Sequence, residues 1–245
     1  MLAKLSVDQA LKKARSHAKK GELLESRKLY KAVLLTFPKN KRAQDGLDSL
    51  NKYEENNLVQ NSLKEQINQL INLYSLGKPK VVAEQAEMLV KKYPHSFIIW
   101  NILGVSLSQM GMIDAATEAY RKCILLNPNY AEVYNNMGMV LSVQGNLNEA
   151  IMLYSRAISL KPDYADAYCN MGHTFQEMDK FEEALKSYEQ AIKLNPNFAE
   201  AYYNIGLTLR SLGNFEEAVL KYSKALELKP DYAEAYSDMG NALQD

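Results

Sequence analysis

A 34-residue period dominates the second half of the chain. Between Ala131 and Tyr232 it occurs three times without insertion or deletion, as AEVYNNMGMVLSVQGNLNEAIMLYSRAISLKPDY, ADAYCNMGHTFQEMDKFEEALKSYEQAIKLNPNF and AEAYYNIGLTLRSLGNFEEAVLKYSKALELKPDY. A fixed period of this length is typical of a solenoid, in which each unit packs only on its neighbours. Such a chain binds with its surface more often than it catalyses a reaction.

Each unit predicts a pair of helices. Numbered from 1 to 34, the unit carries apolar or small residues at positions 4, 7, 8 and 11, which is a helical spacing. Glycine at position 15 ends the first helix, Asp179 takes that place in one unit, and proline at position 32 ends the second helix. Pairs such as Asn146 and Glu149, or Asn129 and Glu132, have the spacing of a capping box.

Small residues recur where the paired helices must approach closely. Glycine occupies position 8 and alanine position 20, while tyrosine at position 24 fills the space opposite. Cys123 falls at position 27, where the other units have alanine, so we interpret it as a core residue and not a nucleophile.

This pattern of W/Y at 4, L/M at 7, G at 8, A at 20, Y at 24, A at 27 and P at 32 resembles the tetratricopeptide repeat family. The resemblance implies an all-α, right-handed superhelical solenoid of antiparallel helix pairs. Its first helices would line a concave groove that binds peptides or proteins. The AxAYxNxG lines look most like the repeats of O-linked N-acetylglucosamine transferases and related bacterial proteins, in which the corresponding asparagines hold the substrate backbone.

The period also organises the rest of the chain. We expect a three-helix module at residues 1–50, a linker at 51–62 that is rich in Asn, and a superhelix at 63–245. The repeats of the superhelix are 63–96, 97–130, 131–164, 165–198, 199–232 and the partial repeat 233–245. Because the last helix would expose Tyr236, Met239 and Leu243, we expect either a longer protein or a face that meets a partner, through which an oligomer could form.

The residues that packing leaves free on the first helix are at positions 2, 6, 9 and 13, which lie within an arc of about 60°. Position 6 is Asn in three successive strong units. A carboxamide both donates and accepts hydrogen bonds, so a row of them can hold a peptide backbone at about 1 kcal/mol each. The alternative is that these amides bond neighbouring helices and only stiffen the solenoid. The predicted groove residues are Asn68, Asn136, Asn170, Asn204, Asp238, Met139, His173, Glu177, Leu207, Asn241, Ile98, Ile102 and Val105.

The unit at 97–130 departs from this row, because Ile102 replaces the Asn and is flanked by Ile98 and Val105. We expect these apolar side chains to meet an apolar ligand side chain or the N-terminal module. The acids at position 2 would favour a basic or neutral ligand. Their position at helix starts is explained by helix stability alone, which is the favoured interpretation.

No motif for catalysis is present. The sequence lacks a phosphate-binding loop, a nucleophile elbow, a zinc-protease helix and a Cys-x-x-Cys pair. His173 and Glu177 are four residues apart, but two ligands make a poor metal site, so a surface pair is the favoured interpretation. We therefore expect no catalytic residue, no metal and no cofactor. The predicted function is a protein-interaction scaffold; the alternative is the substrate-recognition part of a larger glycosyltransferase or sulfotransferase.

Charge and composition limit which kinds of partner and which cellular compartment we expect. Residues 1–42 hold 12 Lys/Arg and 3 Asp/Glu, although the whole chain is neutral. The favoured explanation is a pair of helices whose basic side chains are solvated. The alternative is a basic surface that binds an acidic surface, a nucleic acid or the acidic part of the same chain. No aromatic residues are interleaved with these basic residues, which argues against a nucleic acid as the partner. With no long apolar run, no secretory start and two cysteines without a framework, we expect a cytoplasmic location and no membrane insertion.

Overall fold

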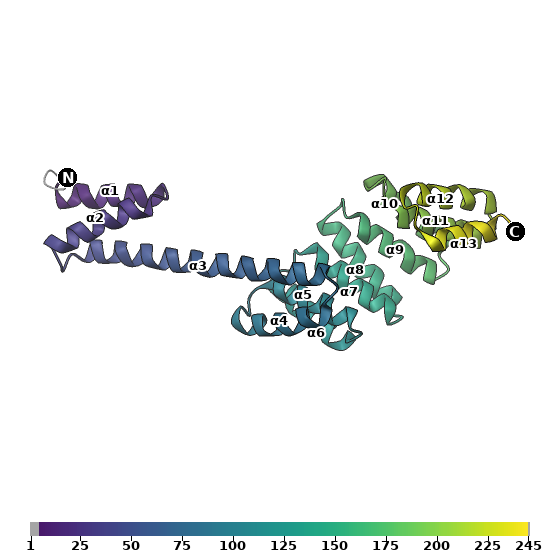
Figure 1. Cartoon of the computed structure of the whole chain (residues 1–245), viewed down its shortest axis with the longest axis horizontal. Helices are drawn as coiled ribbons and strands as arrows, with labels where there is room; N and C mark the ends of the chain where they lie inside the picture. The colour runs from purple at the N-terminus through teal and green to yellow at the C-terminus, as the bar shows by residue number, and fades with distance from the viewer. Residues whose placement is uncertain (1–4, 245) are drawn as a thin grey trace. The chain divides into compact units, whose positions relative to one another are not determined.

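The computed structural model describes residues 5–244. Over this range the chain is all-α, with thirteen helices and no strand, as the sequence predicts. In Figure 1 the helices are labelled in chain order. Their bounds are α1 (Val7–Lys19), α2 (Leu23–Thr36), α3 (Lys41–Ser75), α4 (Pro79–Lys92), α5 (Phe97–Gln109), α6 (Ile113–Leu126), α7 (Ala131–Val143), α8 (Leu147–Leu160), α9 (Ala165–Glu177), α10 (Phe181–Leu194), α11 (Ala199–Ser211), α12 (Phe215–Leu228) and α13 (Ala233–Ala242).

The chain divides into two compact units, Met1–Gln69 and Leu70–Asp245. The first unit contains α1, α2 and most of α3, and its core includes the buried side chains of Leu11, Tyr30 and Leu50. The second unit contains the end of α3 and the helices α4 to α13.

Residues 51–62, expected to be a linker, are helical and lie within α3. The expectation is wrong because a polar composition does not distinguish a loop from an exposed helix. No Gly or Pro occurs between residues 47 and 76, and asparagine lowers helix stability somewhat less than Gly and far less than Pro. The side chains of Leu58 and Val59 are 70% and 52% exposed. The composition therefore reflects a helix with little tertiary packing, and the boundary between the units falls within this helix.

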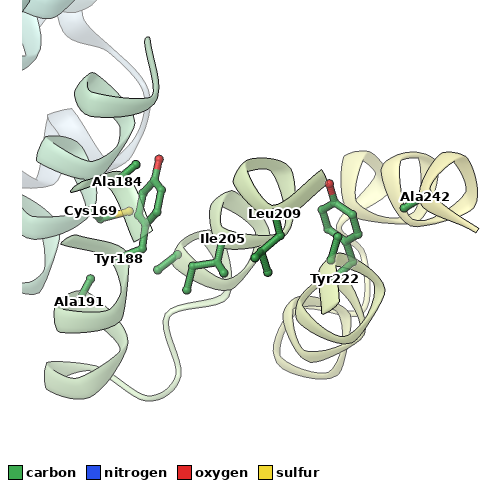
Figure 2. Close-up of a cluster of buried hydrophobic side chains, with 10 residues drawn as sticks. Cys169, Ala184, Tyr188, Ala191, Ile205, Leu209, Tyr222 and Ala242 are labelled. Carbon is green, nitrogen blue, oxygen red and sulfur yellow. The ribbon is translucent and has the colours of Figure 1, made fainter. Parts of the chain in front are cut away.

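Glycine and tyrosine set the distance between the helices of each pair. A Cβ atom built on Gly104, Gly138, Gly172 or Gly206 would lie 2.5 to 2.7 Å from the Cε1 atom of Tyr120, Tyr154, Tyr188 or Tyr222 respectively. These four tyrosines are at most 1% exposed. Figure 2 shows Tyr188 and Tyr222 within the buried cluster formed with residues such as Ala184, Ile205 and Leu209. Position 8 therefore requires glycine because the ring occupies the space of a side chain.

The turns within the pairs need a left-handed backbone. Gly111, Gly145 and Gly213 have φ angles of 73°, 79° and 80°, and Asp179 has 57°. Glycine adopts this conformation without steric cost, and Asp is one of the few other residues that tolerate it. The sequence-based assignment of position 15 is confirmed.

The capping predictions are wrong. Asn146 precedes α8 but makes no side-chain capping bond, and the N-cap of α7 is Tyr130 and not Asn129. Asn127, at position 31 of its unit, stabilises the turn before α7 instead. Asn127 Oδ1 accepts a hydrogen bond of 3.2 Å from the backbone N–H of Asn129. A capping-box spacing therefore does not ensure the capping geometry: the backbone of Asn146 has a ψ angle of 55°, outside the extended region that is typical of a side-chain cap.

Candidate functional site

The odd-numbered helices of the second unit form one continuous wall. Each packs on the next odd-numbered helix, in the pairs α5 with α7, α7 with α9, α9 with α11, and α11 with α13. Within residues 5–244, the even-numbered helices α6, α8, α10 and α12 are farther apart, with no Cα atom of one within 8 Å of a Cα atom of another. In a curved stack the closer row lies on the inside, so the odd-numbered helices form the concave side, here called the inner wall.

The predicted asparagine row lies on the inner wall and joins successive repeats. Asn136 Nδ2 donates to Asn101 Oδ1 at 3.1 Å, and Asn170 Nδ2 donates to Asn135 Oδ1 at 3.0 Å. In the next repeat, Asn204 Nδ2 lies 3.9 Å from a sulfur acceptor, the Sγ atom of Cys169. In every case position 6 of one repeat contacts position 5 of the repeat before it. The amide donors thus do what the alternative interpretation expected, which is to tie neighbouring helices together.

The amide oxygens have a different environment from the donors. The Oδ1 atoms of Asn136, Asn170 and Asn204 accept no hydrogen bond from any residue between 5 and 244. None of these oxygens is completely buried, so each keeps some surface exposed to solvent. Asn136 and Asn170 are half-buried, while Asn204 is 7% exposed. Each amide therefore uses a donor within the solenoid and keeps an acceptor free.

A pocket of about 230 Å³ opens on the inner wall between α7, α9 and α11. Five predicted groove residues line it: Met139, Asn170, His173, Glu177 and Asn204. Ser142 and Thr174, which sequence reasoning did not single out, line it as well and bond to each other at 3.1 Å. Ser142 also donates to Glu177 Oε2 at 2.9 Å. The pocket therefore combines free acceptors with two carboxylates, of which Glu177 is already held by Ser142 and Glu200 is exposed.

A smaller hollow of about 170 Å³ lies where the asparagine row is interrupted. Ile102 and Val105 line it, as predicted, together with Ile71, Tyr74 and Asn101. The Tyr74 hydroxyl accepts a hydrogen bond of 2.6 Å from Gln109 Nε2, which fixes the ring at the edge of the hollow. Ile71 and Tyr74 were missed because they belong to the degenerate unit 63–96, where the period is hard to assign.

The other predicted groove residues differ in accessibility. Both oxygens of Asp238 are bonded, one to the Tyr203 hydroxyl at 2.7 Å and the other to Arg210 Nη1 at 2.9 Å. Leu207 is half-buried and packs against the core cluster of the neighbouring repeats. Asn68 and Asn241 are exposed and Ile98 is half-buried, and none of the three lines either hollow. Asn68 belongs to the first unit.

The electrostatics of the inner wall are simple. Burial, together with the nearby carboxylate of Glu200, raises the pKa of the Cys169 thiol to about 12, so the sulfur is a protonated core group. His173 Nδ1 lies 3.9 Å from Glu177 Oε1. Among residues 5–244, no group of three His, Cys, Asp or Glu side chains is placed to hold a metal ion.

No helix within residues 5–244 combines the length and the apolar character needed to cross a membrane.

Position 5 is the part of the site that sequence reasoning missed. Asn101 and Asn135 are 8% and 4% exposed and accept the bonds that orient the next asparagine. Their only signal in the sequence is an amide next to the row, which is equally compatible with an ordinary polar helix residue.

Comparison with known proteins identifies the repeats. Models of the tetratricopeptide repeat match residues 98–130, 119–152, 165–198 and 187–219, and a further model described as TPR repeat matches 143–179 and 206–245. Together these matches cover residues 98–245 without a gap, which is more than half of the chain. The chain belongs to the tetratricopeptide repeat family. As a member of this family it has the architecture of an interaction scaffold, whose stacked repeats present an extended concave surface.

Solved structures of tetratricopeptide repeat proteins share the fold. The crystal structure of MamA is 29% identical, with a TM-score of 0.57, and the match covers 66% of this chain and 95% of that one. A thermophilic repeat protein of Thermus thermophilus is 22% identical, with a TM-score of 0.64 and coverage of 74% and 99%. YrrB, described as having an unusual peptide-binding site, is 20% identical, with a TM-score of 0.55 and coverage of 70% and 89%. No curated protein matches this tetratricopeptide repeat chain.

Proposed function

We propose that the second unit holds an extended polypeptide of a partner protein along the inner wall. The observation that carries this proposal is the set of free, solvent-accessible Oδ1 acceptors on Asn136, Asn170 and Asn204. They occupy the same position in three successive repeats. Neighbouring helices lie about 10 Å apart, which is roughly the length of three residues in an extended chain. Each acceptor can therefore take one backbone N–H of the ligand, about every third residue.

The surroundings define the chemistry of the ligand. Glu132, Asp166 and Glu200 lie at the N-terminal ends of the inner helices, and the latter two are exposed. These carboxylates favour a neutral or basic segment over an acidic one. The hollow formed with Ile102 and Val105 is lined almost entirely by apolar atoms, so it suits an aliphatic side chain of the ligand. The proposed ligand is thus an extended neutral or basic segment with one aliphatic anchor.

The contribution of the asparagine row can be bounded. A hydrogen bond contributes about 1 kcal/mol net, so three acceptors contribute about 3 kcal/mol, or roughly a 150-fold change in affinity. Recognition through the backbone tolerates many sequences, and its strength increases with the number of repeats engaged.

The test uses peptides selected from a phage-displayed random dodecapeptide library on the full chain. Asn170→Ala removes both the bond to Asn135 and the free acceptor. Asn135→Ala removes the same bond and the 3.8 Å contact of its own Nδ2 atom with Met139 Sδ, but it leaves the Asn170 acceptor in place. We expect Asn170→Ala to weaken binding of a selected peptide about fivefold in fluorescence anisotropy, and Asn135→Ala to weaken it much less. Equal losses in the two variants would mean that the amide acts only through the packing of the repeats.

A second variant tests the anchor. Ile102→Asn extends the asparagine row and removes part of the apolar lining. We expect peptides with a single Leu or Ile to lose affinity for this variant, while peptides in which that residue is Ala bind both proteins alike. If the selected peptides share no aliphatic position, or if Ile102→Asn leaves their affinity unchanged, the hollow is not an anchor site.

A further inference from the structure

The basic charge of the N-terminal residues gathers around one pocket of the first unit. The pocket has a volume of about 510 Å³ and is lined by side chains from α1, α2 and α3. Three cations line it, namely Arg15, Lys19 and Arg42, against one acid, Asp45. The pocket thus concentrates part of the excess of 12 Lys/Arg over 3 Asp/Glu in residues 1–42.

The floor of this pocket is apolar. Tyr30 and Leu50 are 3% and 5% exposed, and Ala18 and Leu23 are half-buried beside them. Gly46 lies against the ring of Tyr30 and adds no side chain of its own. The lining exposes more apolar than polar surface, so an apolar group that enters the pocket is removed from water.

The cations at the rim are available to a partner. Arg15 and Lys19 form no ion pair with any residue between 5 and 244. Arg42 pairs with Asp8 at 2.7 Å, but these side chains are 55% and 79% exposed. A pair this exposed contributes little to stability, so Arg42 can exchange Asp8 for another carboxylate. Arg15 and Lys19, unpaired within residues 5–244, and Arg42, with only an exposed partner, together attract an anionic group.

We propose that this pocket binds an acidic segment of a partner protein, with an aliphatic side chain of that segment on the floor. Carboxylates of the segment pair with Arg15, Lys19 and Arg42, and the apolar side chain fills the space beside Tyr30. A nucleic acid would satisfy the cations but has no aliphatic group for the floor. The site lies wholly within the first unit, and its chemistry is the opposite of that of the inner wall, which favours neutral or basic segments.

The experiment measures binding of three fluorescein-labelled probes to the full chain by fluorescence anisotropy. The first probe is a nine-residue peptide with six Glu and three Leu, and the second replaces each Leu by Ser at the same charge. The third is a single-stranded oligonucleotide of the same net charge. We expect the Leu peptide to bind at least tenfold more tightly than the Ser peptide, and more tightly than the oligonucleotide.

Two charge-reversal variants separate the pocket from net charge. Arg15→Glu with Lys19→Glu changes the rim, whereas Lys31→Glu with Lys39→Glu makes the same change at exposed cations that do not line the pocket. We expect the first variant to weaken binding of the Leu peptide at least tenfold more than the second. Ala18→Trp fills the pocket without a change of charge and should also weaken binding, with far-UV circular dichroism checking that the helices are retained.

Several results would overturn the proposal. The Leu and Ser peptides could bind alike, or neither could bind at low salt; both comparisons use the unmodified chain and do not depend on the folding of a variant. Equal losses in the two charge-reversal variants would indicate a general charge effect. Tighter binding of the oligonucleotide, unaffected by Ala18→Trp, would assign the cations to nucleic acid instead.

Discussion

Gly138→Ala should destabilise the second unit, although alanine is the better helix former. A Cβ atom at this position would lie 2.7 Å from Cε1 of Tyr154 and 3.0 Å from its Cδ1 and Cζ atoms. The ring is 1% exposed, so it cannot turn into solvent without leaving its packing site. The new methyl group and the ring therefore compete for the same space.

The size of the effect follows from two opposing contributions. Overpacking of a filled core costs about 1 to 3 kcal/mol, while Gly to Ala in a helix gains about 1 kcal/mol. Gly240→Ala is the matched control, because a Cβ atom there meets nothing within 4 Å and only the gain remains. Relative to this control, we expect Gly138→Ala to be less stable by about 1 to 3 kcal/mol.

The measurement is urea unfolding followed by circular dichroism at 222 nm, with amide hydrogen exchange to locate the change in α7 and α8. Exchange is needed because a repeat array can unfold in parts. Adding Tyr154→Leu to Gly138→Ala should reduce the cost of the alanine, since the smaller side chain vacates the contested space. Equal stability of Gly138→Ala and Gly240→Ala would refute the steric reasoning.

Four further predictions rest on three features. Gly145→Ala should lower the free energy of unfolding by about 1 kcal/mol and Gly145→Asn by less, because φ is 79° there; equal losses in urea unfolding would contradict this. Burial raises the pKa of Cys123 and Cys169 to about 12, so both should react with a thiol reagent at pH 8 only as fast as the protein unfolds, and a rapid reaction of the folded chain would disprove it. These folded pKa values exceed the unfolded value near 9, so the stability that the two protonated thiols contribute is complete below pH 9. The free energy of unfolding should then fall by about 1.4 kcal/mol per pH unit and thiol as the pH rises towards 12. A free energy of unfolding that stays constant from pH 9 to 11 would exclude this. Amides of residues 55–65, in the exposed part of α3, should exchange faster than those of α7, because an unsupported helix is marginal in water; similar protection would contradict it.

The fold could be predicted from the sequence wherever the period is complete. Glycine at position 8, tyrosine at position 24 and proline at position 32 each have one steric role, and their recurrence defines the helix pairs of residues 97–232. The helical state of residues 51–62 could not be predicted in this way. That segment has no period, and its polar residues are compatible with both an exposed helix and a loop.

The candidate site was predictable only in part for a related reason. Helical geometry places Asn136 and Asn170 on the inner wall, but a single sequence does not reveal which of their amide atoms the next helix uses. The bonds to Asn101 and Asn135 depend on the stacking of one repeat on another. The pocket in the first unit was visible in advance only as an excess of positive charge, because its shape depends on how three helices meet.

The double use of the asparagine amides has a mechanical consequence. The same group that joins two repeats also aims its oxygen at the proposed ligand, so the spacing of the acceptors changes with any stretching of the stack. A peptide backbone has a fixed repeat length and cannot follow that change. An array under tension should therefore release its ligand, and a bound ligand should resist extension of the array.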